Sequence, residues 1–145
     1  MTSGTSVHDA ASRRLAETGQ RYTAQRRLLV SVLASAGRPL TITEILASAP
    51  ALTQSSAYRN LTLLIEAGAV ERIAGTGDRA CFEVAGALAG HHHHLVCRAC
   101  GTVEDLRVSP TLERALSEAA RAAAEEQGYE VTDHRLDFYG RCKAC

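Results

Sequence analysis

The amino-acid sequence predicts an α+β fold in two parts. Helical periodicity dominates residues 1–84 and gives way to two short strand-like segments, whereas residues 91–145 show strands before and after one long amphipathic helix. Residues 85–90, most of which are small, are predicted to form a hinge between the two parts. Strands and helices that are segregated in this way, rather than alternating along the chain, are typical of the α+β class.

Four helices are predicted in the first part, and residues that cap helices mark where they begin and end. The helices are expected at residues 9–18 before Gly19, from Thr23 to Gly37, from Thr41 to Pro50 and from Thr53 to Gly68. Thr41 and Glu44 have the spacing of a capping box, in which each side chain bonds to the backbone N–H of the other residue. The local sequence therefore specifies short helices with defined ends.

Residues 69–74 and 79–84 are predicted to be two strands around a turn at 75–78. Helices followed by such a hairpin describe a winged helix, in which the last helix is the one that enters a DNA major groove. An arginine there can bond to guanine or phosphate, and a tyrosine can pack on a sugar or a thymine methyl group. The candidate DNA contacts on this helix are Ser55, Ser56, Tyr58 and Arg59. A purely structural helical domain is the alternative that periodicity leaves open.

Charge and hydropathy restrict the class of protein. The formal net charge is zero, but five arginines lie within residues 13–27, where they suit phosphate contacts or form a solvated helix face. Hydrophobic residues make up 46% of the sequence, yet no apolar run approaches the roughly 18 residues that span a bilayer. No signal peptide is recognised either, so we expect a cytoplasmic protein with no membrane partner.

Two Cys-x-x-Cys pairs, Cys97/Cys100 and Cys142/Cys145, contain four of the five cysteines. Each pair can present two sulfurs to one tetrahedral ion, so together they predict a structural four-cysteine Zn²⁺ site. Two disulfides are the alternative. Disulfides of that kind belong to secreted domains, however, and this chain is long enough to build a core without them.

Four consecutive histidines, His91 to His94, lie just before the first cysteine pair. Alternate side chains of a strand point to opposite faces, so His91 and His93 would face one way and His92 and His94 the other. Two faces imply two metal sites in addition to the four-cysteine site. A solvated histidine loop is the ordinary alternative.

Four segments resemble the ferric uptake regulator (Fur) family, and they follow the order of that family over residues 10–145. They are Ser55–Leu64, similar to the recognition helix of the family, Gly19–Arg26, similar to its opening segment, His91–Gly101, similar to its metal motif, and His134–Cys145, similar to its C-terminal end. The resemblance implies a metal-dependent repressor that is a homodimer and binds a double-stranded DNA operator.

The resemblance also implies a division of labour along the chain. Residues 1–84 would be a winged-helix DNA-binding domain, 85–90 a hinge, and 91–145 an α/β dimerisation and metal-binding domain. Arg21 and Arg26 would lie beside the DNA backbone, with Tyr58 and Arg59 in the groove.

The same resemblance implies which residues join the histidines. The third site would contain His91, His93, Glu113 and His134. The sensor site near the hinge would contain Glu71, Cys81, His92 and His94. Cys81 and Glu83 alternate on one face of the second wing strand, so which of the two is the ligand stays open. A buried free thiol is the alternative for Cys81.

Two observations favour zinc as the regulatory metal. No histidine lies between His8 and His91, whereas the iron and peroxide sensors of the family use a histidine of the DNA-binding half. A cysteine ligand is also soft, which favours zinc over iron. The chain therefore most resembles the zinc uptake regulators, with zinc-responsive control of metal uptake genes as its expected function. An iron- or peroxide-responsive regulator is the alternative, with Fe²⁺ or Mn²⁺ at the regulatory site.

Two classes other than a repressor are weaker readings of the same residues. A zinc enzyme needs an open coordination position and a general base, but four thiolates leave no opening, and the sequence has no HExxH or HxE-type motif. We therefore expect no enzyme. A zinc-storage protein or structural adaptor is the plainer alternative, and DNA binding that appears only with metal would separate a sensor from both.

Overall fold

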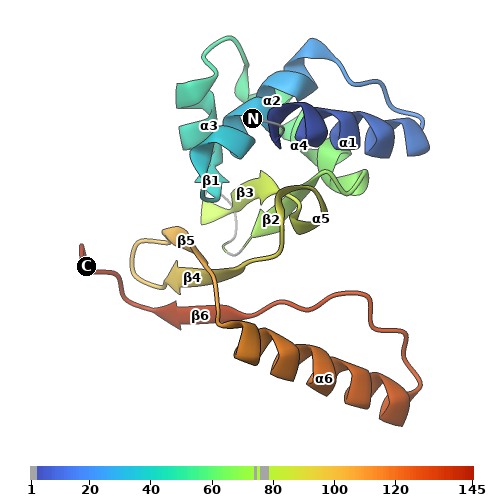
Figure 1. The fold of residues 1–145 in the computed structure, drawn as a ribbon. Coiled ribbons are helices and arrows are strands. Elements are labelled where there is room, and N and C mark those ends of the chain that lie inside the picture. Colours follow the sequence, from blue (N-terminus) through green and yellow to red (C-terminus); the bar gives the residue numbers. More distant parts are fainter. Residues whose placement is uncertain (1–2, 74, 76–78) are drawn as a thin grey trace.

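Two three-stranded sheets organise the chain, one in each half (Figure 1). The structure is a computed structural model that describes residues 3–73, 75 and 79–145. Its elements are α1 (Ser3–Glu17), α2 (Ala24–Ala36), β1 (Leu40–Thr41), α3 (Ile42–Ser48), α4 (Gln54–Glu66), β2 (Val70–Ile73), β3 (Cys81–Val84), α5 (Gly86–Ala89), β4 (His93–Cys97), β5 (Val103–Leu106), α6 (Pro110–Gln127) and β6 (Asp137–Gly140). This order confirms the predicted α+β class, with helices that precede a hairpin as in a winged helix.

Local signals begin and end the helices of the first half. Thr23 caps α2 by accepting a hydrogen bond from a first-turn N–H, and Gly37 ends the helix at φ 65°, a left-handed conformation that glycine adopts without strain. At the start of α3, Thr41 and Glu44 form the full capping box. The second and third helices therefore lie where their caps predict.

Helices α1 to α4 share one hydrophobic core. Leu29, Ile45 and Leu61 are almost completely buried there, and full burial of such a side chain contributes about 1.5–3 kcal/mol. α1 begins at Ser3, earlier than the predicted start, and adds Leu15 to the same core. This packing fixes α4 against α2.

The first sheet has the strand order β1-β3-β2, and both of its pairings are antiparallel. The sequence does not predict β1, because its two residues, Leu40 and Thr41, are too few to show a period. The middle strand β3 is buried along its whole length. Most of the predicted turn at 75–78 lies outside the described residues.

The second sheet has the strand order β5-β4-β6, in which β4 is antiparallel to β5 and parallel to β6. The sequence predicts a long last strand at 129–139, but only Asp137–Gly140 is a strand. The reason is that β4 pairs with β6 from His94 to Cys97 only, and the last backbone contact before this ladder is the Leu136 carbonyl oxygen, which accepts from the N–H of His94.

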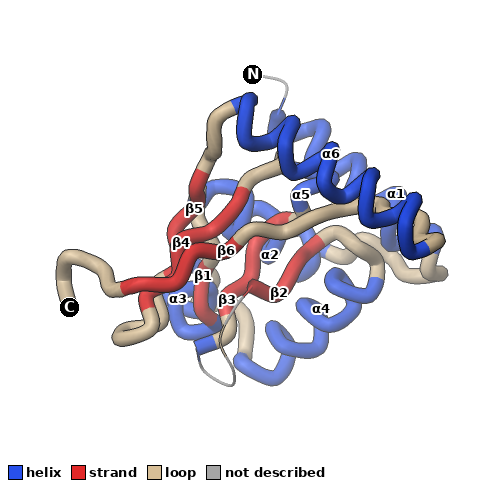
Figure 2. The backbone as a smooth tube through the Cα atoms, turned by 90° about the horizontal axis from the view of Figure 1, so that it is seen from below, coloured by secondary structure: helices blue, strands red, loops and turns tan. Residues whose placement is uncertain are grey.

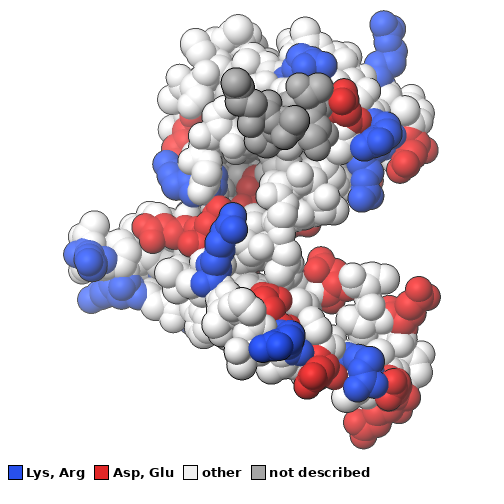
Figure 3. Space-filling view, in the orientation of Figure 1, with Lys and Arg blue, Asp and Glu red and all other residues white. Residues whose placement is uncertain are grey.

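Helix α6 extends from the second sheet and buries none of its residues within the protomer (Figure 1, Figure 2). Acidic side chains gather toward its C-terminal end (Figure 3). The same half exposes several large apolar side chains, namely Leu95, Leu112, Tyr129, Val131, Phe138 and Tyr139. In the part of the chain that the structure describes, no helix is long and apolar enough to cross a membrane.

The two sheets meet in a small apolar junction, in which Ile73 and Cys81 of the first sheet pack with Val96 and Val103 of the second. The predicted hinge contains the short helix α5, which its Ala-Leu-Ala sequence favours. The wing strands β2 and β3 therefore lie beside the strand that carries the histidines (Figure 1).

Candidate metal centres and DNA-reading helix

The four cysteines of the two Cys-x-x-Cys pairs converge at one end of the second sheet. The Sγ atoms of Cys97 and Cys145 are 3.8 Å apart, those of Cys100 and Cys142 3.7 Å, and those of Cys142 and Cys145 3.5 Å. A tetrahedral zinc ion with Zn–S bonds of about 2.3 Å requires sulfurs about 3.8 Å apart. This four-cysteine cluster therefore fits zinc.

Backbone groups prepare the four-cysteine cluster for a cation. The N–H of Cys142 donates to Sγ of Cys97 at 3.3 Å. Backbone N–H groups of Cys100 and Cys142 lower the pKa of the Cys97 thiol to about 5. Hydrogen bonds with Cys142 and Cys100 raise the pKa of the Cys145 thiol to about 12. Zinc binds thiolates, so zinc binding here would release the protons that these thiols carry.

Another group lies on one face of β4 and contains His91, His93, Glu113 and His134. We call it the third cluster, because these residues are expected to form the third metal site. All three histidines point Nε2 at the Glu113 carboxylate, with distances of 3.4 Å for His91 and 3.2 Å for His134, and a closer contact for His93. The Nε2 atoms of His91 and His134 are 3.2 Å apart, close to the ~3.4 Å edge of a tetrahedron with Zn–N bonds of about 2.1 Å. The structure brings all four expected residues of this site together.

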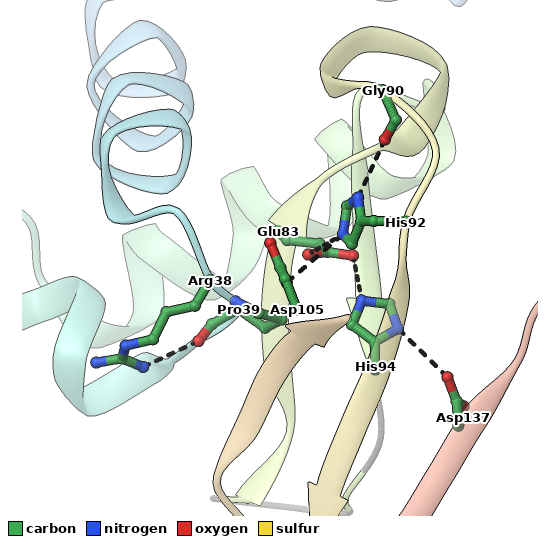
Figure 4. A network of polar contacts seen from close by, with 8 residues as sticks. All are labelled: Arg38, Pro39, Glu83, Gly90, His92, His94, Asp105 and Asp137. Carbon is green, nitrogen blue, oxygen red and sulfur yellow. Dashed lines mark hydrogen bonds and ion pairs between the residues drawn. The ribbon is translucent and has the colours of Figure 1, made fainter. Parts of the chain in front are cut away.

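The remaining group consists of Glu83, His92, His94 and Asp105 (Figure 4). We call it the hinge cluster. The Glu83 carboxylate joins both histidines, since Oε1 lies 2.8 Å from Nε2 of His94 and Oε2 lies 2.9 Å from Nε2 of His92. Asp105 Oδ1 lies 3.6 Å from Nε2 of His92. Two nitrogen and two oxygen donors this close together suit a divalent transition metal.

The charges of the hinge cluster depend on one another. Burial raises the pKa of Glu83, but hydrogen bonds from His94 and His92 outweigh burial and leave this pKa below its ordinary value. Burial lowers the pKa values of His92 and His94, but hydrogen bonds to Glu83 leave both above their ordinary value of 6.5. Burial raises the pKa of Asp105. The negative charge of Glu83 and positive charge on the two histidines therefore favour each other.

Two residues expected at the sensor site lie outside the hinge cluster. Cys81 packs in the apolar junction, its Sγ 3.7 Å from the carbonyl oxygen of Arg79, and burial raises the pKa of its thiol. Glu71 lies opposite Glu83 in the β2–β3 ladder but is not one of the four grouped residues. The structure gathers Glu83 and Asp105 with the histidines instead.

Sequence reasoning missed Asp105, although a signal for it exists. The hairpin around the first cysteine pair aligns Val96 with Val103, and counting two residues back along β4 and two forward along β5 places Asp105 opposite His94. The sequence leaves Glu83 open as an alternative to Cys81, and the position of Glu83, two residues nearer the hinge on the same strand, brings it to the histidines. The membership of the hinge cluster thus follows from strand pairing rather than from residue type.

Helix α4 presents only some of the predicted DNA contacts to solvent. Ser55 and Arg59, four residues apart on one face, are exposed, and Tyr58 is half-buried. Ser56 is buried, and its hydroxyl donates to Oε1 of Gln25 at 2.7 Å. Ser56 therefore attaches α4 to α2, whereas Ser55, Tyr58 and Arg59 line the outer face.

The two arginines expected beside the DNA backbone also differ in their surroundings. Arg26 donates from Nε to Oδ1 of the buried Asn60 at 3.0 Å, and from Nη1 to the carbonyl oxygen of Arg21. Arg21 itself is exposed. The guanidinium of Arg26 thus braces α4 against the start of α2, while Arg21 offers its charge at the surface.

Known proteins resemble this chain in sequence and in fold. The sequence model of the ferric uptake regulator family matches residues 17–139. The peroxide operon regulator of Bacillus subtilis is 28% identical over 135 residues, which is 90% of this chain and 88% of that protein. The structure of the Helicobacter pylori ferric uptake regulator superposes with a TM-score of 0.74 at 23% identity, over 98% of this chain and 93% of the other. A zinc-bound manganese uptake regulator superposes with a TM-score of 0.62 at 28% identity, over 94% and 98%.

Proposed function

The chain belongs to the ferric uptake regulator family and is therefore a metal-responsive transcription regulator, and we propose that it represses metal uptake genes when zinc fills the hinge cluster. What this proposal adds to the family is the identity of the metal and of the residues that sense it. A repressor acts on the chromosome, so the proposal includes a cytoplasmic location.

Glu83 is the observation that carries the proposal. It alone among the hinge-cluster residues comes from a wing strand, whereas His92, His94 and Asp105 belong to the second sheet or lead into it. A bound cation would replace the protons that now join Glu83 to the histidines. Ligation of Glu83 would thus fix the wing, and with it the reader helix, against the second half. A nearly complete switch requires a preference of about 10⁴-fold for this closed arrangement.

The number of ligands supports zinc. The hinge cluster offers four ligand atoms, one from each residue, and the sequence has no histidine between His8 and His91 that could add a fifth. Zinc is typically four-coordinate with nitrogen and oxygen ligands, whereas Mn²⁺ suits octahedral sites rich in oxygen. The preference for zinc therefore rests on coordination number, since Cys81 supplies no thiolate to this cluster.

An iron- or manganese-responsive regulator, including a peroxide-responsive one, is the second candidate. The carboxylates of Glu83 and Asp105 favour it, because two acidic ligands can each bind through one or both oxygens and so raise the coordination number. The similarity to the peroxide operon regulator of Bacillus subtilis also supports this candidate.

The other two clusters have different proposed roles. Four thiolates close the coordination sphere, so we assign the four-cysteine cluster to a structural zinc ion. The third cluster draws its residues from β4, α6 and the segments beside them, all within the second half. It can brace that half but does not reach the wing, so we assign it a supporting role.

We propose that the protein reads DNA as a homodimer. The outer face of α4, with Ser55, Tyr58 and Arg59, is assigned to base contacts, and Arg21 to the phosphates. The unburied α6 and the exposed apolar side chains of the second half support residues 91–145 as the dimerisation part, joined by 85–90 to the reader at 1–84. A dimer would place two readers on a two-fold symmetric operator.

The decisive experiment measures operator binding at buffered concentrations of free metal. DNA is first selected from a random pool by protein treated with each metal in turn, and binding is then compared for Zn²⁺, Mn²⁺ and, without oxygen, Fe²⁺. We expect Zn²⁺ to promote binding at the lowest free concentration. Stronger promotion by Fe²⁺ or Mn²⁺ would favour the second candidate, and DNA binding that no metal changes would refute metal sensing.

A further inference from the structure

Asp137, the first residue of β6, contacts the hinge cluster from outside its ligand set (Figure 4). Its Oδ1 lies 3.3 Å from Nδ1 of His94, and the two residues are paired directly across the parallel β4–β6 ladder. The Asp137 side chain is only 16% exposed, and its other oxygen lies 3.5 Å from Nη2 of Arg135. The carboxylate is therefore held beside the imidazole by the strand register and by a neighbouring arginine.

Both ring nitrogens of His94 contact a carboxylate, one inside the hinge cluster and one outside it. Nε2 points into the cluster at Glu83, whereas Nδ1 points away from it at Asp137. An ionised carboxylate only accepts hydrogen bonds, so Asp137 holds a proton on Nδ1. A metal that displaces the proton shared by Nε2 and Glu83 would then find the Nε2 lone pair directed at the centre of the cluster, which is the form a metal ligand requires.

The neighbouring histidines of the run provide an internal comparison. His92 has the same arrangement as His94, because its Nδ1 lies 3.0 Å from the carbonyl oxygen of Gly90, an acceptor, and its Nε2 points at Glu83. In the third cluster, Nδ1 of His93 is buried and has no hydrogen-bond partner among the described residues. An acceptor behind each ring thus distinguishes the hinge cluster from the buried histidine of the third cluster.

We propose that Asp137 is a positioning residue, which fixes the tautomer and ring orientation of His94 so that the hinge cluster is ready to bind its metal. The inference rests on the proposed role of the hinge cluster as a metal site. It also connects two clusters, because β6 leads directly from Asp137 to Cys142 of the four-cysteine cluster. Folding of the four-cysteine site would hold β6 beside β4 and so place Asp137 behind His94.

The test uses the full-length protein with its four-cysteine site filled with zinc. Zn²⁺ is titrated in competition with a chelator, and occupancy of the hinge cluster is followed through the ring ¹⁵N signals of His92 and His94. Asp137→Ala should weaken metal binding there by about 10–100-fold, as is usual when a partner of a metal-bound histidine is lost. In the metal-free protein at a pH above the raised pKa of His94, where its ring is neutral, the ¹⁵N signals of His94 should also move toward a mixture of tautomers.

Asp137→Asn keeps the size and one acceptor oxygen, so its affinity should lie between those of Asp137→Ala and the wild type. Glu130→Gln, which removes an exposed carboxylate from the same C-terminal stretch, is the matched control and should change neither readout. Replacing Zn²⁺ by Co²⁺ separates a positioning residue from a ligand, because the visible absorption of Co²⁺ should keep its shape and intensity in Asp137→Ala.

Three outcomes would overturn the inference. Wild-type affinity and unchanged His94 signals in Asp137→Ala would show that the contact has no effect on the cluster. An altered Co²⁺ spectrum would make Asp137 a direct ligand instead. A loss of affinity in Asp137→Asn that occurs only together with loss of the structural zinc would reduce the contact to a folding role. If the wild-type hinge cluster took up no metal at all, the proposed function would fail as well.

Discussion

The carboxylate of Glu83, on the middle strand of the first sheet, lies 2.8 Å from Nε2 of His94, on the middle strand of the second sheet. Both residues are almost fully buried, at 5% and 4% exposure. A buried carboxylate needs a compensating positive charge, and here either a proton or a metal ion can provide it. The centres of the two halves are thus joined by a contact whose strength depends on what lies between these side chains.

Replacing Glu83 should uncouple metal binding from DNA binding. In Glu83→Gln the wing loses its ligand, so zinc-dependent operator binding should be abolished, while the dimer and the four-cysteine zinc are kept. Operator affinity with and without Zn²⁺, zinc content and molecular mass measure these three properties. Glu71→Gln is the matched control, since Glu71 lies opposite Glu83 in the ladder but outside the cluster. If the metal response is lost in Glu71→Gln and kept in Glu83→Gln, then Glu71 and not Glu83 is the ligand from the first sheet.

Cys81→Ala should retain the zinc response. The Cys81 side chain lies in the apolar junction, so its truncation should lower the free energy of unfolding by about 1 kcal/mol, within the usual range for single substitutions. Urea denaturation and zinc-dependent operator binding are the two measurements. If Cys81→Ala folds but no longer responds to zinc, Cys81 is a ligand after all.

Cys97→Ser should remove the structural zinc and with it the folded second half. Four ligands from two distant pairs are assembled only by folding, so zinc binding adds free energy of folding on the order of 10 kcal/mol in such sites. Zinc analysis, circular dichroism and sedimentation measure metal content, structure and dimerisation. Cys81→Ala serves again as the control, because its thiol lies outside the cluster and its zinc content should stay unchanged. A folded Cys97→Ser dimer with full zinc content would disprove the assignment.

Arg59→Ala should relax base preference. Arg59 is exposed on the outer face of α4, and loss of a base contact by an arginine costs about 1–3 kcal/mol at the position it reads. Arg21→Ala should instead weaken binding to all DNA sequences alike. It should also reduce the slope of log affinity against log salt concentration, the salt slope, by about one. Binding to operator variants at several salt concentrations separates these effects. Arg121→Ala, an exposed arginine of α6, should change neither property.

Arg26→Ala should act on stability more than on the salt dependence of DNA binding. Its guanidinium bonds to Asn60 and to the backbone of Arg21, and hydrogen bonds of charged groups contribute about 1.5–3 kcal/mol. Chemical denaturation should therefore show a less stable first half. If the salt slope of Arg26→Ala falls by about one and its stability is unchanged, Arg26 contacts a DNA phosphate instead.

The metal-free hinge cluster should lose stability as the solution becomes basic. The pKa values of His92 and His94 are raised above 6.5 by folding, so their contribution is complete below pH 6.5 and is lost as the pH rises through the raised values. The pKa of Glu83 is lowered below 4.5, so its contribution is present above pH 4.5 and is lost as the pH falls through the lowered value. The charged hinge-cluster residues therefore add most to the free energy of unfolding between pH 4.5 and 6.5.

The measurement compares the free energies of unfolding of the metal-free wild type and Glu83→Gln, between about pH 6 and about pH 8.5. The difference should shrink as the pH rises. Zinc affinity at the hinge cluster should change in the opposite direction, since metal must displace the protons of His92 and His94. A stability difference that grows with pH would contradict the raised histidine pKa values.

Much of this architecture is predictable from local sequence. Thr23, Gly37 and the Thr41–Glu44 capping box place two helices, because a cap satisfies backbone groups within a few residues of itself. The alternation of side chains along a strand separates His91 and His93 from His92 and His94. These features depend on neighbours in the chain, so pattern alone is sufficient.

The features that pattern does not predict depend on partners far along the chain. Asp105 joins the hinge cluster because β5 pairs with β4, and β6 is short because β4 offers it only four residues. Ser56 and Asn60 lie beside the apolar stripe of α4, where a polar side chain can face either solvent or the interior. Gln25 of α2 accepts hydrogen bonds from both, so they face inward.

The C-terminal end of β4 fixes the positions of the four histidines. Cys97 at that end belongs to the four-cysteine cluster, and the strand ladders set the register of the residues before it. Loss of one histidine codon would place Gly90 directly before the remaining three, which keep the positions of His92, His93 and His94. The third cluster would lose a ligand, whereas the hinge cluster would keep both of its histidines. Such a deletion would thus change the third cluster while the four residues of the hinge cluster keep their places.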